Sequence, residues 1–174
     1  MRKQKGFSLI ELLIVVAIIL IIAAIAIPNL MRSRMSANES AGAQTVRTLI
    51  TNEIAYSTSY PTVGYATNIG NLGGTAAPCT PSSTSACLID GVLGCGGGPC
   101  VRDAYRYTAD GVPTGTPAIN TDFIIFATPN GPTMGNKDYC STSDGVPRFN
   151  GTGLTPPTTK IANTACIAPT YANL

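Results

Sequence analysis

A long apolar run near the N-terminus constrains this chain more than any other feature. Across residues 7–27 the only polar side chains are Ser8 and Glu11. As a helix, a run of 21 residues extends about 32 Å at ~1.5 Å per residue, enough to cross a bilayer core of ~30 Å. The sequence therefore predicts a membrane-spanning helix over residues 7–27.

A removable secretory signal is the competing interpretation of this segment. Arg2, Lys3 and Lys5 give it a basic start, and Ala24-Ile25-Ala26 has the small-x-small pattern of a cleavage site. The apolar part of such a signal normally spans only ~7–15 residues. The anchor interpretation is therefore favoured, and the basic residues before the span keep that end of the helix in the cytoplasm.

Glu11 is the unusual residue of the run. An ionised carboxylate in hydrocarbon costs roughly several kcal/mol, so carboxylates inside membrane segments are usually paired and functional. The alternative is that Glu11 only extends to the membrane interface and has no partner. The pattern favours a functional carboxylate whose partner lies elsewhere.

The residues around Glu11 resemble a known processing signal. The stretch Lys5-Gly6-Phe7-Ser8-Leu9-Ile10-Glu11-Leu12 is similar to the class III signal of bacterial type IV pilins and type II secretion pseudopilins. This chain and the class III signal share a short basic leader, a Gly before the cut, a Phe after it and a Glu as the fifth mature residue. A Pro follows the span in both. The resemblance implies that a prepilin peptidase removes the leader, residues 1–6, by cutting between Gly6 and Phe7, and that the amine of Phe7 is methylated.

The same resemblance implies a partner for Glu11, namely the Phe7 amine of a neighbouring subunit in a filament. Two unit charges ~4 Å apart attract by about 4 kcal/mol at an effective dielectric constant of 20. Because each charge is costly in lipid when unpaired, such a pair sets the register between subunits more than it adds stability.

The helix is predicted to continue beyond the membrane. Pro28 lacks an N–H group and should kink it, and residues 28–59 form an amphipathic continuation that ends before Tyr60-Pro61. An apolar stripe predicted to dock on a small sheet comprises Val46, Leu49, Ile50 and Ile54. The charged residues predicted to lie on other faces, in solvent or at subunit contacts, are Arg32, Arg34, Glu39, Arg47 and Glu53.

Residues 60–174 are predicted to form a globular head. Residues 60–103 constitute a Cys-rich loop, and residues 104–150 contain about three strands, at 104–108, 122–128 and 146–150, followed by a C-terminal tail. A three-stranded antiparallel meander over the helix resembles the head of pseudopilin G. The predicted fold class is α+β: a long N-terminal helix packed on a small antiparallel sheet with disulfide-tied loops.

All six cysteines lie in the head, and an even count beside a membrane-type segment indicates disulfides formed outside the cytoplasm. A thiolate zinc site is the alternative, but no two close-spaced Cys pairs occur. Local pairing is preferred, with crossed pairing among the first four cysteines left open. The preferred pairs are Cys79–Cys87, Cys95–Cys100 and Cys140–Cys166.

Several function classes are excluded or disfavoured. The chain has no histidine, which removes Ser-His and Cys-His catalysis and His-containing metal sites. Of 11 basic side chains, three lie within residues 1–6, which leaves eight against nine acidic ones, so no nucleic-acid contact is predicted. Calcium at Asp138 or Asp144 and glycans at Asn38 or Asn150 have only slight support. We expect no enzyme activity and no cofactor.

The predicted function is a structural subunit of a type IV pilus-like filament that polymerises through its N-terminal helix. The resemblance implies copies of itself, the prepilin peptidase, and an inner-membrane assembly platform with its motor ATPase as partners. The chain would lie in the inner membrane before assembly and in an extracellular pilus afterwards. The alternatives are a G-like pseudopilin in a periplasmic pseudopilus, and a secreted disulfide-rich binding module.

Overall fold

A computed structural model describes residues 8–74, 78–96, 98–115, 118–151, 166–167, 169 and 171–174. Its first element is the helix α1 (Leu9–Ser59), which contains Pro28. The helix ends where the chain reaches Tyr60 and Pro61, as expected for a residue that precedes proline. The chain divides into two units, residues 1–34 and 35–174, and the second contains the C-terminal half of α1 with the sheet.

The head contains one antiparallel sheet in which every strand pairs with the next one along the chain. A short helix, α2 (Ile69–Leu72), precedes it. The strands are β1 (Cys100–Arg102), β2 (Tyr105–Thr114), β3 (Ile119–Pro129), β4 (Asp138–Thr142), β5 (Arg148–Asn150) and β6 (Ala172–Asn173).

The α+β prediction is confirmed, but the sheet has six strands where the sequence predicts about three. β4 has only a weak sequence signal because Asp138-Tyr-Cys-Ser-Thr142 does not alternate and has a single β-branched residue. β2 is longer than predicted because a register shift between Val112 and Pro113 accommodates the proline, which has no N–H to donate. The predicted Cys-rich loop is also partly regular, since it contains both α2 and β1.

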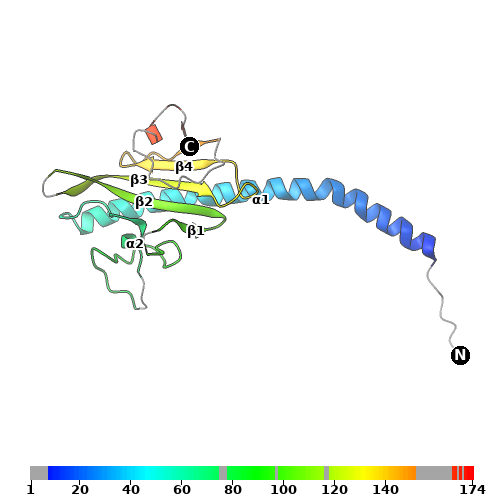
Figure 1. Ribbon diagram of the computed structural model, residues 1–174, viewed down its shortest axis with the longest axis horizontal. Coiled ribbons are helices and arrows are strands. Elements are labelled where there is room, and N and C mark those ends of the chain that lie inside the picture. The colour runs from blue at the N-terminus through cyan, green and yellow to red at the C-terminus, as the bar shows by residue number, and fades with distance from the viewer. Residues whose placement is uncertain are drawn as a thin grey trace. The chain divides into compact units, whose positions relative to one another are not determined.

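The C-terminal half of α1 lies across one face of the sheet, behind β2 and β3 in Figure 1. Val46, Leu49 and Ile50 are buried there, as the apolar stripe predicts, whereas Ile54 is 51% exposed. The stripe instead continues through Glu53 and Tyr56, both fully buried. The sheet contributes alternate residues of β2 and β3 to this core, including Tyr105, Tyr107, Ala109, Phe123, Ile125 and Ala127.

The opposite face of the sheet is covered as well. Ile124 and Phe126 of β3 form a second buried cluster with Cys140 and Cys166, and Tyr171 packs against it. Because both of its faces are covered, β3 is buried continuously from Phe123 to Pro129. A strand buried on both faces is expected to read as an apolar run without alternation.

Three disulfides are present, which confirms the expectation of disulfide-tied loops. Two lie in the segment between α1 and β2, and the third joins β4 to the C-terminal end of the chain. The pairs are Cys79–Cys87, Cys95–Cys100 and Cys140–Cys166.

Candidate functional site

The first turn of α1 provides a local hydrogen-bond partner for Glu11. Ser8 directly precedes the helix, and its backbone N–H donates a hydrogen bond of 3.0 Å to Glu11 Oε2. The Ser8 carbonyl accepts the first helical bond, from Leu12 N–H at 3.3 Å. This is one half of a capping box, in which a Glu three residues after the N-cap reaches back to the N-cap amide.

The cap gives Glu11 a local role that the sequence analysis does not predict. A negative charge in the first turn is stabilised by the helix dipole, and the carboxylate satisfies an amide that α1 leaves unpaired. The S-x-x-E spacing of Ser8 and Glu11 is the sequence signal for it. Gly6 and Phe7 lie outside the described residues, so the proposed cleavage site and the proposed partner amine stay predictions.

The N-terminal part of α1 presents a continuous apolar surface. Every large apolar side chain from Leu9 to Met31 is at least 46% exposed within the single chain. This part of α1 is also long and apolar enough to cross a membrane. Contiguous apolar surface of this extent marks a membrane or protein contact. Pro28 lies within it, and the kink expected there stays a prediction.

A second group of contacts holds α1 to the loop between β3 and β4. Asn38 Nδ2 donates to the carbonyl oxygen of Met134 at 2.9 Å. The Glu39 carboxylate accepts from Asn136 N–H at 2.9 Å and lies 3.3 Å from Lys137 Nζ. The prediction that Glu39 lies on a solvated face is therefore wrong, because its side chain is only 14% exposed. These contacts attach the helix to the sheet near the start of the head.

The same contacts bear on the glycosylation hypothesis. The Asn38 amide nitrogen is already used as a donor, on a helix, and it faces the Met134 carbonyl. A glycan on that nitrogen would displace this hydrogen bond. The other candidate, at Asn150, includes Thr152, which lies outside the described residues.

Glu53 is the other charged residue whose predicted exposure is wrong. Its side chain is fully buried, and its Oε2 accepts a hydrogen bond from Ala66 N–H at 2.9 Å. Burial raises the pKa of Glu53 to about 8, against the lowering effect of that hydrogen bond, and the charge of Asp110 raises it further. The carboxyl is therefore mainly protonated at neutral pH.

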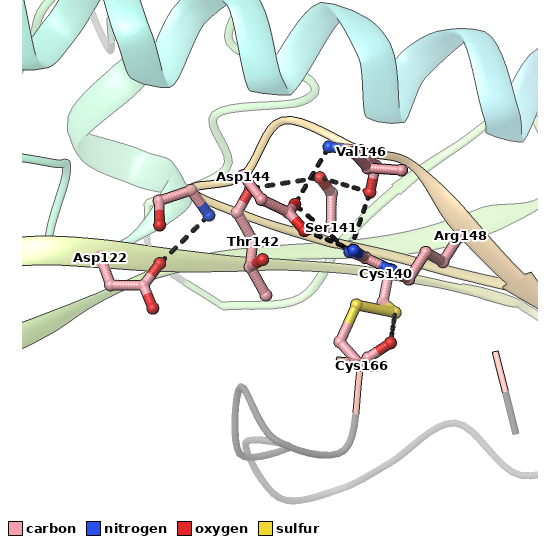
Figure 2. A network of polar contacts seen from close by, with 9 residues as sticks. Asp122, Cys140, Ser141, Thr142, Asp144, Val146, Arg148 and Cys166 are labelled. Atoms are coloured by element: carbon pink, nitrogen blue, oxygen red, sulfur yellow. Dashed lines mark hydrogen bonds and ion pairs between the residues drawn. A yellow bond between two sulfur atoms is a disulfide. The ribbon is translucent and has the colours of Figure 1, made fainter. Parts of the chain in front are cut away.

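The turn between β4 and β5 contains Asp144, one of the two calcium candidates (Figure 2). Asp144 forms an ion pair with Arg148 and accepts a hydrogen bond from Val146 N–H at 3.0 Å. The Arg148 hydrogen bond holds the pKa of Asp144 below its ordinary value. The neighbouring Asp122 Oδ1 accepts from Ser143 N–H at 3.1 Å. Among the described residues no cluster of three metal-ligating side chains occurs, and the Asp144 carboxylate is paired with the Arg148 guanidinium.

Of the tyrosines near the end of α1, Tyr56 is a buried core residue, and Tyr60 and Tyr65 are partly buried against the same core. The rings of Tyr56 and Tyr60 lie 4.9 Å apart, and those of Tyr65 and Phe123 lie 4.8 Å apart. Tyr56 also donates to the Ser83 carbonyl at 2.5 Å, which ties the Cys-rich segment to the helix. These contacts give each of the three tyrosines a structural role.

Comparison with known proteins agrees with this architecture. Residues 1–27 match the family model described as the prokaryotic N-terminal methylation motif. The chain is 29% identical over 198 aligned residues to the type IV major pilin protein PilA of Myxococcus xanthus, covering 96% of this chain and 90% of the relative.

A second relative matches at the N-terminus alone. The type IV wide pilus major component PilA4 of Thermus thermophilus is 62% identical over 40 residues, which are 23% of this chain and 30% of the relative. The chain thus combines a prokaryotic N-terminal methylation motif with a long apolar helix and a disulfide-bonded α+β head. It is similar to type IV pilus proteins, along most of its length to one and at the N-terminus to the other.

Proposed function

We propose that this chain is a subunit of a type IV pilus-like filament and polymerises through its N-terminal helix after cleavage between Gly6 and Phe7. The observation that carries the proposal is the exposed apolar surface of α1 before residue 32, joined in one chain to a disulfide-bonded head. In a bilayer this surface contacts lipid. In a filament it contacts the same surface of other copies, at ~25 cal/mol per Å² of apolar area buried.

The proposed sequence of events uses a small number of residues. Before assembly, the chain lies in the inner membrane with its basic leader in the cytoplasm. A prepilin peptidase removes residues 1–6 and leaves the amine of Phe7, which is methylated. An assembly platform and its motor ATPase then bring copies together, and Glu11 of one subunit pairs with the Phe7 amine of another. The heads form the outer layer of an extracellular pilus.

Relatives named as major pilins support a pilus over a pseudopilus. The resemblance to pseudopilin G depends on a three-stranded plan, which does not describe the observed six-stranded sheet. Shearing cells separates the two, because a major pilin is released in large amounts and a periplasmic pseudopilin is not.

The processing step is tested by the intact mass and N-terminal sequence of the mature protein from its native host. We expect a chain that starts at N-methylated Phe7. A chain that starts near Ile27 would overturn the proposal, because the apolar helix would then be discarded and the head would be a secreted module.

The charge pair is tested by Glu11→Ala and Glu11→Gln. Both variants should be cleaved and inserted normally but form few or no filaments, because neither carries the negative charge that attracts the amine. Gln retains a side-chain oxygen that can accept from Ser8 N–H, so it separates the helix cap from the charge. Normal filaments from Glu11→Gln would exclude the charge pair while leaving the processing step intact.

A further inference from the structure

Glu53 joins α1 to the segment that follows it. This segment, Val63–Thr67, is here termed the latch segment. Ala66, near its C-terminal end, is fully buried and donates its N–H to Glu53 Oε2 at 2.9 Å. The second carboxyl oxygen, Oε1, is also buried, and among the described residues it has no hydrogen-bond partner. A buried acceptor without a partner is rare and needs an explanation.

The other side of the latch segment is attached to the β2–β3 hairpin. Asn120 of β3 donates its backbone N–H to the Val63 carbonyl, and its own carbonyl accepts from Tyr65 N–H, both at 2.9 Å. Its side-chain amide donates to the Tyr65 carbonyl at 2.8 Å. The latch segment therefore bridges α1 and the sheet, with the Glu53 carboxyl on one side and Asn120 on the other.

The surroundings of Glu53 suit a neutral carboxyl and oppose a charged one. The charge of Asp110 of β2 opposes ionisation of Glu53. The pKa of Tyr56 of α1 is raised, first by burial and also by the charge of Glu53. A neutral carboxyl accepts the Ala66 N–H through its carbonyl oxygen and leaves only an uncharged hydroxyl at Oε1. An ionised one leaves a charge at the unpartnered Oε1, which is expensive in a buried site.

We propose that Glu53 is a proton-operated latch, which holds the latch segment on α1 when protonated and releases it when ionised. Loss of the proton makes it favourable for the carboxylate to reach water, and the simplest route is separation of the latch segment from the helix. The device acts within the head, so the inference does not depend on filament assembly.

The sign of the pH effect follows from linkage. Glu53 titrates with a pKa of about 8 in the closed head, against an ordinary value of 4.5, so the closed state holds a proton that the open state releases. Between pH 4.5 and about pH 8, the equilibrium constant for opening should rise about tenfold per pH unit. Above about pH 8 it should level off. The head is therefore tightest in mild acid and loosens towards alkaline pH.

Amide hydrogen exchange tests this on the full chain in detergent micelles. The wild-type protection factor at Ala66, corrected for intrinsic exchange, should fall about tenfold per pH unit up to about pH 8. Glu53→Gln retains an acceptor for Ala66 N–H and cannot ionise, so its protection should not change with pH. Glu39→Gln is the matched control, because it neutralises another hydrogen-bonded carboxylate of α1 and should retain the wild-type pH dependence at Ala66.

A carboxyl-carbon NMR titration of the wild type gives an answer that requires no variant. The Glu53 signal should titrate near pH 8, whereas a midpoint near its ordinary value would overturn the latch. Wild-type protection at Ala66 that stays constant with pH would overturn it equally, as would a Glu53→Gln variant that keeps the wild-type pH dependence.

Discussion

Cys140 of β4 and Cys166 near the C-terminal end are joined by a disulfide, and both residues are fully buried against β3. The bond holds the end of the chain over the face of the sheet that α1 does not cover. Ile124 and Phe126 owe part of their burial to this cover. The disulfide therefore completes a second small core in addition to closing a loop.

Removing this disulfide should destabilise the head more than removing either of the others. Its cysteines are 26 residues apart, and the loop-closure term for such a loop is about 3.5 kcal/mol. Exposure of the second core adds to this. The double variant Cys140→Ser, Cys166→Ser should show the largest drop in the free energy of unfolding, measured by urea denaturation without reductant.

The matched control is Cys79→Ser with Cys87→Ser, whose cysteines are eight residues apart. The same loop-closure term gives about 2.5 kcal/mol for it. A difference between the two double variants of no more than about 1 kcal/mol, which loop closure alone accounts for, would show that the second core contributes little.

Gly64 should tolerate no side chain. Its φ is +81°, and a Cβ there would lie 2.1 Å from the Asn120 carbonyl oxygen. Gly96 also has a positive φ, +86°, but open space around it, and Gly98 has open space without a positive φ. Alanine at Gly98 should be near neutral, alanine at Gly96 should cost about 1 kcal/mol, and alanine at Gly64 should cost clearly more.

Thermal unfolding of the three glycine variants measures the stability cost of each alanine. The difference between Gly96→Ala and Gly64→Ala isolates the steric clash with Asn120 from the backbone conformation. A Gly64→Ala variant as stable as Gly96→Ala would mean that the latch segment moves away from β3 without cost.

The contribution of Glu39 to the stability of the head should separate into a hydrogen-bond part and an ion-pair part. Glu39→Gln retains an acceptor for Asn136 N–H but loses the attraction to the Lys137 charge, so it should cost less than about 1 kcal/mol. Glu39→Ala also removes the acceptor and should cost roughly 1–3 kcal/mol. Urea denaturation of both variants, with Lys137→Ala completing a double-mutant cycle, measures the two parts. If Glu39→Gln and Glu39→Ala lose the same amount of stability, the ion pair accounts for the whole effect.

Asp144 should stabilise the β4–β5 turn in a pH-dependent manner. Its folded-state pKa lies below the ordinary 3.8 because Arg148 donates to it. The stabilisation is thus fully present when the pH is above the ordinary pKa, and it is lost as the pH falls through the folded-state pKa. Since the side chain is 37% exposed, solvent screening limits the effect, and Asp144→Asn should cost about 0.5 kcal/mol at neutral pH.

The check is urea denaturation of wild type and Asp144→Asn at neutral pH and at a series of acid pH values below the ordinary pKa of an Asp carboxyl. The difference between the two proteins should shrink towards zero in acid. A difference of the same size at neutral and acid pH would assign the effect to side-chain shape.

Sequence reasoning predicts the features of this fold that depend on strong local signals. The apolar run, the helical stripe at Val46, Leu49 and Ile50, and the β-branched core of β3 all have a characteristic period or composition. β4 and the short strands β1 and β6 have no such signal, because their neighbours in the sheet determine their conformation.

The buried carboxyl of Glu53 escapes sequence reasoning for a related reason. Its position on α1 continues the apolar stripe, but a Glu at such a position is normally exposed. Only the fold shows that the latch segment covers it. The Ser8–Glu11 cap, by contrast, is visible in the S-x-x-E spacing but is obscured by the stronger membrane pattern around it.

The two outermost strands of the sheet have a consequence for contacts between copies of the chain. β1 has three residues and β6 has two, so the strands at both borders of the sheet are short. Short borders of this kind discourage strand addition between molecules, which is the route to amyloid-like aggregates. In the proposed filament, neighbouring heads can thus lie side by side without pairing their sheets, so contacts between the helices would determine how copies of the chain associate.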